Sequence, residues 1–158
     1  MSESTHQPAP ETARRQRWMG VLAKAPPQAL AAHLEALGEL PAFSWLRRPE
    51  SGSVMVKARV GGSGLPFHLG EMTVTRCAVR LDNGAVGHAY VQGRDRRHAE
   101  RAAVLDAWLQ DARHHDALMQ AVIEPLESAH TAHRRERSRK AAATRVEFFT
   151  MVRGENPK

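Results

Sequence analysis

Near the start of the chain, apolar side chains recur every three or four positions, which is the spacing of a helix that buries one face. Residues 1–12 lack this spacing, are polar and hold two prolines, so we expect a disordered leader there. Helices are predicted over 14–25 and 27–37, because two prolines separate them and a glycine follows the second. Their apolar positions are Trp18, Leu22, Leu30, Leu34 and Leu37.

The pattern then changes to the alternation of a β-strand. Apolar residues at every second position predict a strand over 54–60, with lysine and arginine on its outer face. The Pro-Glu-Ser-Gly sequence at 49–52 predicts a turn before it. A glycine-rich stretch follows over 61–70. Such loops can offer backbone N–H groups to a phosphate, but this one lacks the spacing of the known phosphate-binding motifs, which favours a plain connection.

Two further strands, over 72–81 and 85–92, flank Asn83-Gly84, a dipeptide typical of a two-residue hairpin turn. That turn sets a register between the strands. On the face expected to meet the core it pairs Leu81 with Val86, Val79 with His88, Cys77 with Tyr90, and Thr75 with Gln92. On the face expected to meet solvent or a partner it pairs Arg80 with Gly87, Ala78 with Ala89, Arg76 with Val91, and Val74 with Gly93.

Helical spacing returns after the hairpin. Asp95 is predicted to cap a helix whose buried face holds Ala102, Leu105 and Leu109. Another helix is expected around 118–123, and residues 130–140 are polar and basic, which predicts an exposed helix.

The chain closes with a predicted strand over 145–152 that carries apolar residues on both faces. Covering by a partner subunit at Phe149 and Met151 explains this, and so does a central position in the sheet. The expected fold class is therefore α+β. An antiparallel sheet with strands near 54–60, 72–81, 85–92 and 145–152 is packed by N-terminal, central and C-terminal helices.

Composition limits the choice of function. The chain has 158 residues, enough for one domain with a real core. No apolar run reaches the roughly 20 residues of a membrane helix, and no secretory signal is visible. The single cysteine fits a reducing compartment, so we expect a cytoplasmic protein. The net charge of +6 favours anionic partners without choosing among them.

The candidate anion-binding residues gather in and after the hairpin. Arginine side chains at the start of a helix can hold a phosphate, although a solvated first turn with its own ion pairs explains the same residues equally well. The candidates are Arg76, His88, Gln92, Arg94, Arg96, His98 and Glu100.

Other signals favour structural explanations. The histidines and glutamate at 68, 71, 88 and 98 lack the spacing of metal ligands, so no metal site is expected. Cys77 lies mid-strand and is expected to be buried and inert. The basic run at 133–140 has no stacking aromatics nearby, which favours a solvated helix or a protein docking face over nucleic acid.

Three long segments together carry a resemblance that no single motif does. Residues 64–77 (GLPFHLGEMTVTRC), 87–98 (GHAYVQGRDRRH) and 141–154 (AAATRVEFFTMVRG) resemble the G subunit of the phosphonate carbon–phosphorus lyase complex, the PhnG family. Arg17–Ala23 (RWMGVLA) resembles the start of that family. The likeness implies a single PhnG-like domain over 13–156.

The resemblance implies a subunit of a cytoplasmic core complex with the H, I and J subunits, contacting I most directly. In that family the G, H and I subunits, with the L subunit, transfer methylphosphonate to C1 of the ribose of ATP and release adenine. MgATP and phosphonate would then be substrates of the complex. This subunit would hold no cofactor, since one cysteine cannot ligate an iron–sulfur cluster. The resemblance leaves its catalytic residues undefined. The charge alone leaves a basic, non-enzymatic adaptor for nucleic acid or protein as the alternative.

Overall fold

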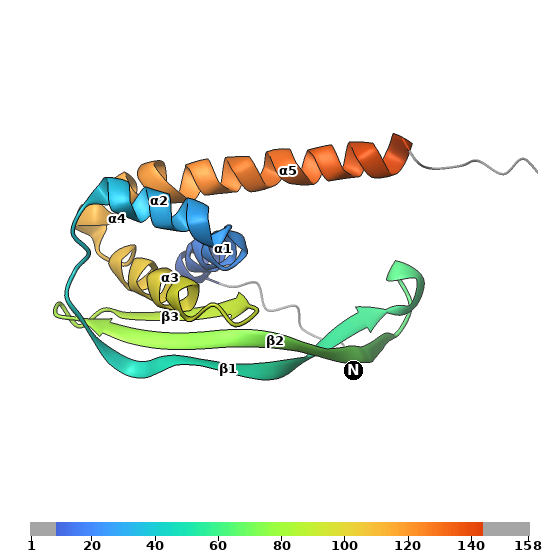
Figure 1. Ribbon diagram of the computed structural model, residues 1–158, viewed down its shortest axis with the longest axis horizontal. Coiled ribbons are helices and arrows are strands. Elements are labelled where there is room, and N and C mark those ends of the chain that lie inside the picture. Colours follow the sequence, from blue (N-terminus) through green and yellow to red (C-terminus); the bar gives the residue numbers. More distant parts are fainter. Residues whose placement is uncertain (1–8, 144–158) are drawn as a thin grey trace, which may run out of the picture.

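The computed structural model describes residues 9–143 and shows an antiparallel sheet with helices stacked on one side (Figure 1). This confirms the α+β class. Two short turns, η1 (Val60–Gly62) and η2 (Met119–Ile123, a π-helical turn), connect longer elements. The helices and strands are α1 (Pro10–Lys24), α2 (Pro27–Leu37), β1 (Phe43–Arg59), β2 (Pro66–Leu81), β3 (Val86–Gln92), α3 (Arg96–Trp108), α4 (Ala112–Leu118) and α5 (Glu124–Ala143).

The first two helices follow the predicted pattern. Each begins with a proline at its first position, where the missing N–H costs no hydrogen bond. The second ends at Gly38, whose φ of 87° suits glycine. The start of α1 at Pro10 overlaps the end of the predicted leader, and residues 1–8 lie outside the described part of the chain.

Helix α3 is the centre of the packing. One side of α3 lies against β2 and β3, and α1 and α2 pack against it as well (Figure 1). Its sheet-facing residues are small, and Gly87 of β3 approaches so closely that an added Cβ would lie 1.9 Å from the Ala103 carbonyl oxygen. The fully buried large side chains Leu22, Leu30, Leu105, Leu109 and Ile123 fill the core. Within residues 9–143, no helix covers the opposite face of the sheet (Figure 1).

The first strand is much longer than predicted. The expected turn at 49–52 is wrong, because these residues belong to β1, which begins at Phe43. The register against β2 shifts between Arg47 and Glu50, so the strand passes Pro49 through an irregularity rather than a reversal. Since β1 is an edge strand in the described sheet, a proline there can face away from the ladder without costing a hydrogen bond.

The predicted register of the second hairpin is wrong by one residue. Cys77 lies opposite Ala89, and Arg76 lies opposite Tyr90. The Leu81 N–H donates to the Ala85 carbonyl, so the loop has three residues, 82–84. Only Gly84 in it has positive φ, whereas a two-residue type I′ turn needs positive φ at both positions. This places Val79 and Cys77 on the core face as predicted. It moves the side chains of His88, Tyr90 and Gln92 to the exposed face and those of Ala89 and Val91 to the core.

The second strand also begins earlier than predicted. Strand β2 begins at Pro66, inside the stretch predicted as a glycine-rich connection. The connection shortens to a tight turn in which the Gly64 N–H donates to the Val60 carbonyl at 2.8 Å. Gly61 and Gly62 adopt positive φ in this turn, which explains the need for glycine. The loop is therefore the tip of the β1–β2 hairpin.

The C-terminal helix α5 is exposed along its basic stretch, as predicted for 130–140. The predicted strand 145–152, with the candidate interface residues Phe149 and Met151, lies outside the described residues. Within residues 9–143, no helix combines the length and apolar composition needed to cross a bilayer.

Candidate functional site

A buried carboxylate connects α1, α3 and β3. Asp106 of α3 is fully buried and accepts two hydrogen bonds from the Arg15 guanidinium, at 3.1 and 2.7 Å. It also accepts from Trp18 Nε1 and from the backbone N–H of His88, each at 2.9 Å. Arg15 donates further to the Val86 carbonyl at 3.1 Å. Every buried donor at this junction thus has a partner, which makes Asp106 the polar centre of the fold.

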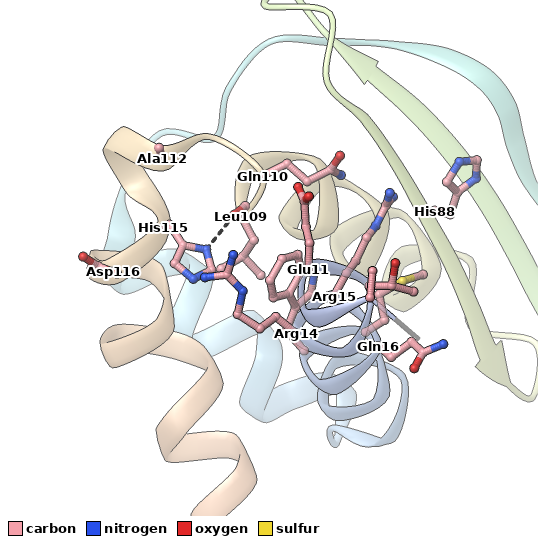
Figure 2. A pocket seen from close by; sticks show the side chains of 14 residues that line it. Glu11, Arg14, Arg15, Gln16, His88, Leu109, Gln110, Ala112, His115 and Asp116 are labelled. Carbon is pink, nitrogen blue, oxygen red and sulfur yellow. Dashed lines mark hydrogen bonds between the residues drawn. The ribbon is translucent and has the colours of Figure 1, made fainter. Parts of the chain in front are cut away.

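A cavity of about 810 Å³ opens above this cluster, between the start of α1, the α3–α4 connection and β3 (Figure 2). Its polar lining residues are Glu11, Thr12, Arg14, Arg15, Gln16, His88, Gln110, His115 and Asp116. Figure 2 shows Arg14 on α1 and His115 on the α4 side of the cavity, with His88 on the strand at the other end.

The charges of this cavity limit what it can bind. Arg15 is already paired with Asp106, while Glu11 and Asp116 oppose the charge of Arg14. The His115 Nδ1 lies 2.8 Å from the Leu109 carbonyl oxygen, which can only accept, so Nδ1 carries a hydrogen. The cavity therefore suits a polar ligand of mixed charge and lacks the excess of positive charge that a triphosphate needs.

The outer face of the sheet holds several of the predicted site residues. In the corrected register Arg76 lies opposite Tyr90. His88 and Gln92, two residues before and after Tyr90 on β3, lie on the same exposed face. Arg76 Nε donates to Glu50 at 2.7 Å. Tyr90 and then Glu50 raise the pKa of Arg76, while Arg47 and then Arg76 lower the pKa of Glu50. Arg76 is thus engaged in a surface ion pair.

The start of α3 places Arg94 and Arg96 in solvent. Neither forms an ion pair with a carboxylate among residues 9–143. Asp95 caps the helix, as predicted, by accepting from the His98 backbone N–H at 2.9 Å. Arg94 and Arg96 therefore stand on either side of the Asp95 cap in the chain, and that cap already bonds one backbone N–H of the first turn.

His98 has a structural position. Its ring is buried, and Nε2 donates to the Leu22 carbonyl at 2.8 Å, which joins α3 to α1. Glu100 is half-buried. The structure therefore brings Arg76, His88 and Gln92 onto one exposed face and directs the ring of His98 into the core. Within residues 9–143, no group of three histidine, cysteine or acidic side chains is placed to hold a metal ion.

Cys77 is buried in the sheet, as predicted from its place in the middle of a strand. Burial, followed by the charge of Glu100, raises the pKa of the thiol to about 11. At neutral pH the thiolate is the reactive form, so we expect alkylation in the folded chain to be at least about 100-fold slower than in urea. The rate of reaction with iodoacetamide measures this, and the chain has no other cysteine to confuse it. Equal rates in both states would contradict the buried position.

Sequence comparison places these features in a family. The family model described as "Phosphonate metabolism protein PhnG" matches residues 13–154. The chain belongs to the PhnG family. A PhnG relative from Rhizobium meliloti (strain 1021), alpha-D-ribose 1-methylphosphonate 5-triphosphate synthase subunit PhnG, is 43% identical over 144 residues, covering 91% of this chain and 92% of the relative. The resemblance stated from the three segments is confirmed.

Sequence reasoning missed the cluster around Asp106. A signal for it was present: an aspartate stands within the apolar run Ala102–Leu109. A carboxylate on the buried face of a helix requires donors from elsewhere in the fold. Its partners Arg15 and Trp18 are three residues apart, on one side of α1, but nothing in the sequence pairs them with α3.

Proposed function

We propose that this chain is the G subunit of an alpha-D-ribose 1-methylphosphonate 5-triphosphate synthase, acting in phosphonate use. The observation that carries the proposal is the 43% identity to the Rhizobium meliloti subunit over nearly the full length of both chains. The excess of positive charge supports it, because ATP and methylphosphonate are both anions.

In the reaction we propose for the complex, a phosphonate oxygen forms a bond to C1 of the ribose of ATP. The bond from C1 to adenine breaks, and adenine leaves with a proton. The partners proposed are the H, I and J subunits, I most directly, with L needed for the reaction. We place the complex in the cytoplasm. The described polar clusters of this chain join its own elements, which supports an accessory role beside a catalytic partner.

Co-expression tests this function. The full chain, tagged, is produced with the H, I, J and L subunits, purified, and supplied with MgATP and methylphosphonate. We expect the subunits to copurify and adenine to be released, and omission of this chain to abolish the release. A chain that recovers no partner but binds nucleic acid would overturn the proposal in favour of the basic adaptor.

Arg94 and Arg96 are the anion contacts that we propose within this function, with Arg76, His88 and Gln92 as the weaker candidates. Both guanidinium groups are exposed and lack carboxylate partners among residues 9–143. Arg94→Ala with Arg96→Ala is expected to lower adenine release by about tenfold or more, because a hydrogen bond to a charged group contributes about 1.5–3 kcal/mol.

The double variant should still assemble, since neither side chain is buried. A matched control is Arg134→Ala with Arg135→Ala on the exposed part of α5, which removes the same charge elsewhere. Unchanged adenine release from the Arg94 and Arg96 variant would count against these contacts. An equal loss in the control would assign the effect to net charge.

A further inference from the structure

The tip of the β1–β2 hairpin extends beyond the rest of the sheet (Figure 1). Pairing of β3 with β2 ends at Gln92 and Val74, and the last bond across this edge is from the Gly93 N–H to the Thr73 carbonyl. Beyond that point β2 has only β1 as a neighbour among the described strands. We call residues 54–72 the arm.

The arm exposes an unusual amount of apolar surface. Five of its large hydrophobic side chains have exposed fractions between 42% and 83%, while Val54, Val56 and Met72 are half-buried. Two of the five stand at alternate positions of β2, and a third stands just before that strand. The five exposed residues are Met55, Val60, Leu65, Phe67 and Leu69. A two-stranded ribbon is at best marginally stable in water, so an arm of this kind gains from being covered.

The charge of the arm indicates what covers it. Residues 54–72 contain Lys57 and Arg59 against a single acidic residue, Glu71, so the arm carries a net positive charge. Packing two copies of the arm together would bring two surfaces of net positive charge close, which disfavours a homodimer through this surface. A surface that is apolar with carboxylates at its rim would complement both features of the arm.

The free edge of β2 favours a protein over a lipid surface. In the arm, this edge carries backbone N–H and C=O groups that pair with no strand among residues 9–143. A strand from another protein can bond to them, whereas hydrocarbon cannot. Within the arm the register against β1 shifts once, between Val56 and Lys57, where Leu69 of β2 has no partner on β1; the edge of β2 is regular on either side of that residue.

We propose that the arm is the element by which this chain docks onto another subunit of the synthase, one whose receiving surface is apolar with carboxylates at its rim. The inference rests on the proposed function and adds to it the surface that makes the contact. The arm is a different part of the chain from the proposed anion contacts, Arg94 and Arg96, which lie at the start of α3.

The test uses the full chain co-expressed with the H, I, J and L subunits. Phe67→Glu with Leu69→Glu is expected to lower the recovered partner subunits at least tenfold. The isolated variant should keep its circular dichroism spectrum and melting temperature, because both side chains are exposed. Leu46→Glu is the matched control, an exposed leucine of β1 outside the arm, and should leave recovery unchanged.

A second measurement does not depend on a variant. Amide hydrogen exchange over 66–72 is expected to slow at least tenfold between the isolated chain and the complex. Lys57→Glu with Arg59→Glu is expected to weaken assembly in low salt. Assembly unaffected by that charge reversal would overturn the acidic character of the receiving surface.

The outcomes separate the two proposals. If the unaltered chain recovers no partner, both the proposed function and the docking inference fail. If it assembles, and the Phe67 and Leu69 variant assembles equally or exchange over 66–72 is unchanged, only the arm is overturned. Loss in the Leu46 control to the same extent would also overturn it. So would arm-dependent dimerisation of the isolated chain, or arm-dependent binding to phosphatidylglycerol vesicles.

Discussion

Replacing Asp106 by alanine is expected to lower the free energy of unfolding by about 3 kcal/mol or more. The carboxylate is fully buried and accepts from Arg15, from Trp18 Nε1 and from the His88 backbone N–H. Alanine leaves the last two donors without a partner away from water. Arg15 suffers less, because a third of its side chain is exposed and can be hydrated.

The measurement is chemical unfolding in urea, followed by circular dichroism. Asp106→Asn keeps one oxygen and removes the charge, so its loss should fall between those of the wild type and the alanine variant. Asp116→Ala is the control: it removes an exposed carboxylate of α4 and should change the free energy by no more than about 0.5 kcal/mol. Similar midpoints for the Asp106 and Asp116 variants would contradict the central role of the buried cluster.

Gly87→Ala is expected to destabilise the fold by about 2 kcal/mol or more through a steric clash. An added Cβ would lie 1.9 Å from the Ala103 carbonyl oxygen, 2.6 Å from the Ala107 backbone nitrogen and 2.8 Å from the Ala107 Cβ. The first two atoms are helix backbone and cannot rotate away. Strand β3 and helix α3 would have to separate, which loosens the packing on both.

The chain offers a matched control in Gly20→Ala. Gly20 lies inside α1, and a Cβ there would meet no atom within 4 Å. The same substitution should therefore raise stability by about 0.5–1 kcal/mol, because alanine favours the helix. Thermal unfolding of the two variants should shift in opposite directions. A Gly87→Ala variant as stable as the wild type would show that β3 and α3 do not approach as closely as the structure has them.

The helices could be predicted because their signals are local. Pro27 begins one helix, Gly38 ends it, and Asp95 caps another. Each of these depends on the backbone preference of one residue and on neighbours within a turn. These helix boundaries can therefore be predicted without knowing which distant residues the helix packs against.

The strands were predicted less well, because pairing depends on partners. The Asn83-Gly84 dipeptide indicated a hairpin correctly, but the loop took in residue 82 as well. A one-residue difference moved His88 and Tyr90 to the face that carries Arg76. Residues 49–52, predicted as a turn, are part of β1, because the residues before and after Pro49 both pair with β2.

The candidate site shows the same division. Arg94 and Arg96 were identified from their density near a helix start, and they are exposed there. His98, in the same segment, is directed into the core, where the Leu22 carbonyl lies far from it in sequence. The sequence offered no means of separating these residues, since the distinction depends on which side of α3 meets α1.

The amino-acid sequence by itself determined the family, the α+β class, the first helices and the cap of α3, because these depend on long matching segments and on local backbone preferences. Only the tertiary structure decided the register of the sheet, the cluster around Asp106, the cavity beside it and the exposed arm. Each of these is set by contacts between residues far apart in the chain. Arg15 and Asp106, separated by 91 positions, form an ion pair only because α1 and α3 pack together.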